Sequence, residues 1–134
     1  MITRSPEEKV SESRLGAVVV MATSLYLAEV FSRRLSVEDL SAILHGLEEE
    51  GLDVEPVAMR RVPGGVYSEN VAHWIGMLEA FGCGRADSCT KPIELNSSGW
   101  QIVHEIISKE RTQNADFLRV SPLILKQIQR LIPQ

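Results

Sequence analysis

The residues best suited to chemistry are two cysteines and two of the histidines. Cys83 and Cys89 carry thiols, which bind zinc as thiolates. His73 and His104 could complete such a site, because imidazole is another common zinc ligand. The spacing does not fit, since the chain contains no C-x-x-C pair and only this one pair of cysteines. We therefore predict no metal site and no cofactor, and nothing in the pattern supports a redox switch between the thiols.

The sequence lacks the common catalytic motifs. It contains no nucleophile elbow, phosphate-binding glycine loop or kinase-type signature. His104 and Glu105 lack the second histidine of an H-E-x-x-H motif, and Gly64 and Gly65 follow a proline, as in a turn. Acid and base residues cannot be paired from this pattern. We therefore predict that the protein is not an enzyme, with a small enzyme of unrecognised type as an alternative.

Composition and charge are those of an ordinary folded chain. Of its 134 residues, 44% are hydrophobic and 24% are charged, which predicts a single domain over residues 1–134. The formal net charge of -4 gives no overall attraction to nucleic acid or anionic lipid. The few cysteines and the acidic residues near the N-terminus are unlike those of a secreted protein, so we expect a cytoplasmic location.

The first and last helices are predicted from serine-proline pairs. Ser5-Pro6 opens a helix that extends to about Arg34. Its residues 15–31 are the most apolar stretch of the chain, yet they are fewer than a membrane span needs and include a charged residue. They predict a buried central helix and no membrane partner. Ser121-Pro122 opens a short amphipathic helix, and residues 112–134 are predicted to serve docking or dimerisation.

Three further helices are predicted between these two. Ser36 and Asp39 form a capping box for the second helix, and Ser68 and Asn96 cap the third and fourth. A glycine is placed to end each of the second and third. The apolar stripe of the third helix consists of Val71, Trp74, Ile75, Leu78 and Phe81. We expect the second and third helices to meet in one interior around Leu44, Trp74 and Leu78.

Two segments favour extended structure. Residues 54–62 contain β-branched residues and Pro56, which suit an extended connection or an edge strand, and a turn follows at residues 63–65. Residues 83–95 are rich in turn residues and predict a small β-hairpin whose return strand is 93–95. The predicted fold class is therefore mainly α with a small β-hairpin, as a winged-helix-like bundle of about five helices.

The order helix, helix, turn, helix, hairpin, helix is that of a winged-helix domain. Within it, Gly65-Val66-Tyr67-Ser68, followed by an apolar helix and L-x-x-x-G, resembles a passage of small prokaryotic and phage proteins of the Panacea type. Residues 92–99 are similar to the strand-to-helix passage after the wing of many winged-helix regulators. The resemblance covers about Ser36 to Ile107 and implies an antitoxin, an adaptor or a regulator.

The segment from residue 60 to residue 73 is the predicted binding edge. Its candidate contact residues are Arg60, Arg61, Tyr67, Asn70 and His73. Tyr67 would be an aromatic anchor of the kind enriched at interfaces. Residues 38–55 carry acidic side chains without Lys or Arg, which also suits a basic protein partner. We therefore predict a non-enzymatic binding module whose partner is another protein or a second copy in a homodimer.

The alternative function is a winged-helix regulator that binds DNA. Its basic contacts would come from Arg60, Arg61, Arg85 and Lys91. However, the helix that would enter the groove, over residues 68–82, contains no Lys or Arg, and base readout relies heavily on these residues. The charge pattern therefore favours a protein partner over DNA.

Overall fold

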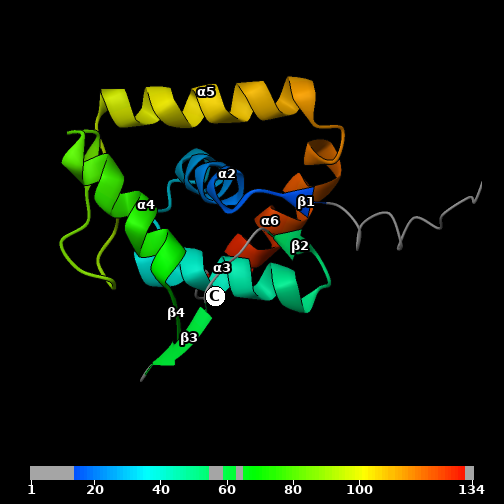
Figure 1. The fold of residues 1–134 in the computed structure, drawn as a ribbon, viewed down its shortest axis with the longest axis horizontal. Helices are drawn as coiled ribbons and strands as arrows, with labels where there is room; N and C mark the ends of the chain where they lie inside the picture. Colours follow the sequence, from blue (N-terminus) through cyan, green and yellow to red (C-terminus); the bar gives the residue numbers. More distant parts are fainter. Residues whose placement is uncertain (1–13, 55–58, 63–64, 132–134) are drawn as a thin grey trace, which may run out of the picture.

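Helix α2 (Ala17–Val30) runs through the middle of the structure, a computed structural model that describes residues 14–54, 59–62 and 65–131. Residues on several sides of α2 are buried, so it has to be covered from several directions. The helices that cover it are α3 (Val37–Glu49), α4 (Glu69–Ala80), α5 (Ser97–Gln113) and α6 (Phe117–Leu131). In Figure 1, α5 crosses above α2, α3 lies below it, and α4 and α6 flank it. The prediction of a mainly helical fold is confirmed.

The predicted start of the first helix is wrong. Ser5-Pro6 lies outside the described residues, but strand β1 (Arg14–Leu15) precedes α2 and pairs in parallel with strand β2 (Asp53–Val54). Gly16 between β1 and α2 is extended, with φ of -67° and ψ of 146°. Because this bridge joins parts of the chain that are far apart in sequence, local capping signals do not reveal it.

Helix α2 also ends earlier than predicted, in a Schellman motif. The N–H of Arg33 donates to the carbonyl of Ala28 at 2.7 Å, and the N–H of Ser32 donates to that of Glu29 at 3.0 Å. Ser32 has a φ of 57°, in the left-handed region that favours glycine. The corresponding positions after α3 and α4 are glycines, with φ of 90° and 71°.

Helix α3 begins and ends where the sequence predicts. The Asp39 N–H donates to the Ser36 hydroxyl at 3.1 Å, and the Ser36 N–H donates to the Asp39 carboxylate at 2.9 Å. These two bonds complete the capping box. Gly51 then adopts its left-handed conformation directly after the C-cap residue, Glu50.

Helix α4 is also confirmed, except at its last predicted apolar position. The N–H of Val71 donates to the Ser68 hydroxyl at 3.4 Å, which caps the helix as expected. Trp74 and Leu78 are buried in the core cluster that also contains Leu44. Phe81 was expected on the same buried stripe, but 77% of it is exposed. It is the C-cap residue, about one turn beyond Leu78, which is the last buried residue of the helix.

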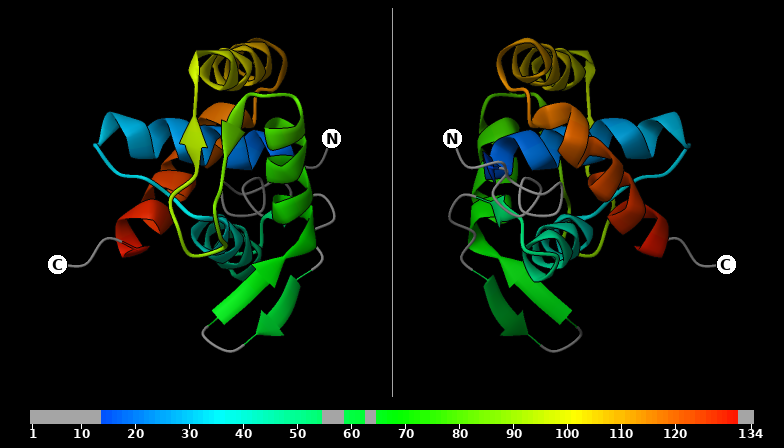
Figure 2. Two further views of the ribbon diagram at one scale, coloured as in Figure 1. Left: turned by 90° about the vertical axis from the view of Figure 1, so that its left-hand side faces the viewer. Right: turned by 90° about the vertical axis from the view of Figure 1, so that its right-hand side faces the viewer.

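Two antiparallel strand pairs flank α4. Strands β3 (Met59–Val62) and β4 (Gly65–Ser68) form a ribbon that extends beyond α3 and α4, away from the helices (Figures 1 and 2). The turn predicted at residues 63–65 lies mostly outside the described residues. Strands β5 (Gly84–Arg85) and β6 (Glu94–Leu95) confirm the predicted small hairpin, with Gly84 opposite Leu95.

The predicted start of the last helix is wrong. Helix α6 begins at Phe117, before the expected Ser121-Pro122, and the proline lies inside it. Phe117 and Val120 are buried, so packing on the core extends the helix toward its N-terminus. Pro122 has no N–H to donate to the carbonyl of Leu118, four residues earlier. Leu118 is 65% exposed, so water can supply the hydrogen bond that this carbonyl lacks. α6 packs on α2 and α3 of its own chain.

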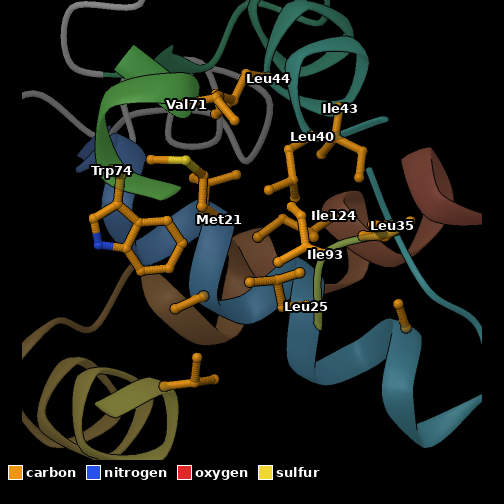
Figure 3. Packing of buried hydrophobic residues seen from close by; sticks show 14 of the residues in the cluster. Met21, Leu25, Leu35, Leu40, Ile43, Leu44, Val71, Trp74, Ile93 and Ile124 are labelled. Carbon is orange, nitrogen blue, oxygen red and sulfur yellow. The ribbon is translucent and has the colours of Figure 1, made fainter. Parts of the chain in front are cut away.

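The core is a single cluster of side chains from α2, α3, α4, α5, α6 and the hairpin. Figure 3 shows Met21 and Leu25 of α2 facing residues from the surrounding elements. The residues it labels from those elements are Leu40, Ile43, Leu44, Val71, Trp74, Ile93 and Ile124. None of the helices in the described part of the chain is both long and apolar enough to cross a membrane.

Replacing Ser32 with glycine should stabilise the protein by about 0.5–1 kcal/mol, because glycine adopts the left-handed conformation without the steric cost of a Cβ. Urea denaturation would detect this as a higher midpoint at an unchanged slope. Ser108→Gly, at an exposed position inside α5, is the matched control and should destabilise by about 0.5 kcal/mol. A loss of stability in Ser32→Gly would contradict the left-handed assignment.

Candidate binding surface

The predicted binding edge is divided between the ribbon and α4. In the ladder, Arg60 is opposite Tyr67 and Arg61 is opposite Val66, and Asn70 follows in the first turn of α4. Only the backbone positions of these residues are within the described part of the structure, so their side-chain contacts stay a prediction. His73 of α4 is exposed.

The base of the ribbon is fixed to α3 by a buried hydrogen-bond chain. The N–H of Ser68 donates to the hydroxyl of Ser41 at 3.0 Å, and that hydroxyl donates to the carbonyl of Val37 at 2.9 Å. Both serines are fully buried. A buried polar group without a partner is costly, so these bonds hold the ribbon and the start of α4 at one position on α3.

The outward side of α4 carries an exposed row of small and apolar residues. We call it the α4 stripe, and it consists of His73, Gly76, Met77, Ala80 and Phe81, all exposed. His73, Met77 and Phe81 are four positions apart from one to the next, as are Gly76 and Ala80, so the two rows lie side by side on one face. Met77 is 44% exposed and Phe81 is 77% exposed. This face was not predicted from the sequence, because Phe81 was expected to face inward and Met77 was not assigned to either face.

Two open hollows are both lined by the residues of β6. One, of about 350 Å³, is lined by Gly82, Gly84, Arg85, Glu94, Leu95 and Asn96. The other, of about 300 Å³, is lined by Glu29, Arg34, Ile93, Glu94, Leu95 and Trp100. Glu94 lines both hollows, so its carboxylate lies between Arg85 of the first hollow and Arg34 of the second.

The arginines of these hollows are paired with acidic side chains. Arg85 Nε lies 3.1 Å from Glu94 Oε2 and 4.0 Å from Asp87 Oδ1, and Arg34 approaches Glu94 Oε1 at 3.5 Å. Such exposed pairs add at most about 1 kcal/mol to stability. They nevertheless reduce the positive potential that Arg85 was predicted to offer to DNA. Lys91 is exposed in the loop between β5 and β6.

The residues first considered as metal ligands have other environments. Cys83 is buried and Cys89 is exposed, and both are free thiols. His104 contacts the ring of Tyr26 edge-on, with centroids 5.4 Å apart. Among the described residues, no three or more His, Cys, Asp or Glu side chains gather to hold a metal ion.

No protein-family model matches this chain, and no curated protein or solved structure is similar to it at a significant level. The resemblance to winged-helix proteins of the Panacea type therefore stays a prediction that depends on sequence passages and on the order of the elements.

The start of α5 is packed tightly against the hairpin. The Asn96 side chain accepts from the Gly99 N–H at 2.9 Å, and the Asn96 N–H donates to the Cys83 carbonyl at 3.1 Å. A Cβ on Gly99 would overlap that same carbonyl oxygen, which is backbone and cannot move alone. By contrast, a Cβ on Gly76 in the α4 stripe would meet no atom within 4 Å.

Gly99→Ala should therefore destabilise the protein by about 1–3 kcal/mol through overpacking. Gly76→Ala is the matched control, and it should stabilise by up to about 1 kcal/mol, because alanine favours a helix more than glycine does. Thermal unfolding of the two variants would measure the opposite shifts. Equal effects of both substitutions would contradict the tight contact between α5 and the hairpin.

Proposed function

We propose that the protein is a non-enzymatic binding module that recognises another polypeptide through the α4 stripe. An antitoxin, an adaptor or a regulator would act in this way. The proposed place of action is the cytoplasm, which is consistent with two cysteines that are both free thiols.

The exposure of Phe81 and Met77 on one helix face is the observation that carries this proposal. Single apolar residues are ordinary on protein surfaces, but adjacent large ones favour an interaction site. Complete burial of a Phe or Met side chain contributes about 1.5–3 kcal/mol. Covering both would therefore supply a useful part of the free energy of a protein complex. His73, at the other end of the stripe, was already a predicted contact.

The charges near the stripe support a protein partner over DNA. Helix α4 contains Glu69 and Glu79 and no Lys or Arg, so phosphate groups would be repelled. Arg85, the nearest predicted DNA contact on the hairpin, is paired with Glu94 and Asp87. The hollow lined by Arg85 and Glu94 also supports binding over catalysis. These two are its charged lining residues, and they pair with each other, which leaves neither free to act as an acid or a base.

Photo-crosslinking tests this proposal. With p-benzoylphenylalanine in place of Phe81, irradiation of cells of the native host should give covalent adducts with a polypeptide, because the ring at this position would be buried by the partner. The adducts are resolved by gel electrophoresis and mass spectrometry.

The matched control places the same amino acid at Gln113, an exposed position at the end of α5. No specific adduct is expected there. Adducts with nucleic acid at position 81 would instead favour the DNA-binding regulator. Equal crosslinking at positions 81 and 113 would contradict a binding role for the α4 stripe.

A further inference from the structure

We propose that the α4 stripe binds the outward face of α6 from a second copy of this chain. This inference rests on the proposed function and names the partner. The proposed contact joins two different surfaces, so the copies would be arranged head to tail.

The outward face of α6 has the chemistry that the α4 stripe lacks. We call it the α6 stripe, and it consists of Leu118, Arg119, Pro122 and Lys126, all exposed. Leu118, Pro122 and Lys126 are four positions apart from one to the next, and Arg119 lies three positions before Pro122, so the four lie side by side on the helix. Leu118 is 65% exposed although α6 buries its other face on α2 and α3. The α6 stripe therefore combines an exposed apolar side chain with two cations.

The helices that carry the two stripes are complementary in charge, and the α4 stripe itself contains no acidic side chain. Residues 69–80 contain two glutamates and no Lys or Arg, whereas residues 117–131 contain Arg119, Lys126 and Arg130 and no Asp or Glu. The helix dipoles add to this difference, because Met77 and Phe81 lie at the C-terminal end of α4 and Leu118 lies at the N-terminal end of α6. Opposite charges and opposite dipole ends would therefore meet around an apolar centre.

The cations of the α6 stripe can exchange partners at little cost. Arg119 pairs with Asp116 one turn away, and Lys126 Nζ lies 3.7 Å from Glu50. Both cations are at least 40% exposed, and exposed ion pairs contribute at most about 1 kcal/mol. A glutamate from a second copy could therefore compete for them.

The small residues of the α4 stripe allow a helix to approach closely. Gly76 and Ala80 are four positions apart, and the space at the Cβ position of Gly76 is open. Leu118 of a second copy would fit over these two residues, beside the row formed by Met77 and Phe81. This is the ridge-into-groove arrangement by which helices pack at 8–10 Å.

The positions of the stripes in the fold determine the kind of assembly. The left panel of Figure 2 looks onto the side of α4 and the right panel onto the side of α6, so the two helices lie on opposite sides of the core. One pair of copies cannot then make both contacts around a two-fold axis. Contacts of this kind give rings or open chains. Two-fold contacts of α4 with α4 or α6 with α6 would instead bring like charges together.

Sedimentation equilibrium of the full chain tests the assembly. The average mass should rise with protein concentration, should exceed twice the monomer mass, and should fall as salt is raised from low concentration, because salt screens the charges between stripes. A folded protein that stays a monomer at millimolar concentration in low salt would overturn the inference.

Two variants test the head-to-tail contact directly. Phe81→Gln removes the aromatic ring from the α4 stripe without adding an acid that the α6 cations would attract, and Leu118→Glu puts an acid at the apolar centre of the α6 stripe. Each variant alone should be a monomer. An equimolar mixture should form a dimer of twice the monomer mass and nothing larger, because each copy keeps the one stripe that the other has lost. Gln113→Glu on α5 is the matched control and should assemble like the wild type. Far-ultraviolet circular dichroism and the unfolding midpoint confirm that each variant is folded.

The other outcomes are decisive as well. If either variant assembles alone, the stripe that it has lost is not needed for assembly, and the head-to-tail arrangement is wrong. If the wild type is monomeric while position 81 crosslinks to a different polypeptide, the proposed function stands and the second copy is excluded as partner. If position 81 crosslinks to no polypeptide and the protein is monomeric, both proposals fail.

Discussion

Burial of α2 on all sides is the constraint on which the rest of the structure depends. This helix contains a run of six buried residues from Val20 to Leu25, so its middle turns have no side that can face water. Two of the six are polar. Ser24 donates to the carbonyl of Val20 at 2.7 Å, whereas the hydroxyl of Thr23 has no hydrogen-bond partner among the described residues. Burying the Thr23 hydroxyl without a partner costs free energy, but covering the apolar surface of α2 outweighs this cost. Each surrounding helix has one apolar face with which to cover it.

The way in which the helices end explains why aromatic side chains reach the surface. Both α2 and α4 end in Schellman motifs, with Phe31 and Phe81 as C-cap residues. The C-cap residue still lies on the helix surface, but the chain turns away directly after it, so no further turn of helix covers its side chain. Both rings are more than half exposed. The same left-handed turn that stops α4 therefore also places an aromatic group at the end of the α4 stripe.

The features that the sequence predicted correctly are those that depend on interactions between residues close together in the chain. The capping box of Ser36 and Asp39 and the hairpin at residues 83–95 depend on neighbours in the chain, and both are present. The β1–β2 bridge and the early start of α6 depend on packing between distant segments, and both were missed. The candidate site was harder to predict for the same reason. Whether Met77 or Phe81 is exposed depends on where α4 ends and on which helices lie against it.

Charge has two separate roles on α6. On its inner side, the carboxylate of Glu50 accepts from the Gln127 amide at 3.0 Å and lies 3.6 Å from Arg130, which joins the end of α3 to α6. Gly46 makes room for this contact, because a Cβ there would overlap the Gln127 side chain. Glu50 is one acid near two cations, so α6 keeps a positive surplus after it has docked. The surplus extends to its outer face through Lys126. An acidic chain thus carries one basic helix, and the interactions that fix this helix in the fold also leave it able to attract an acidic surface.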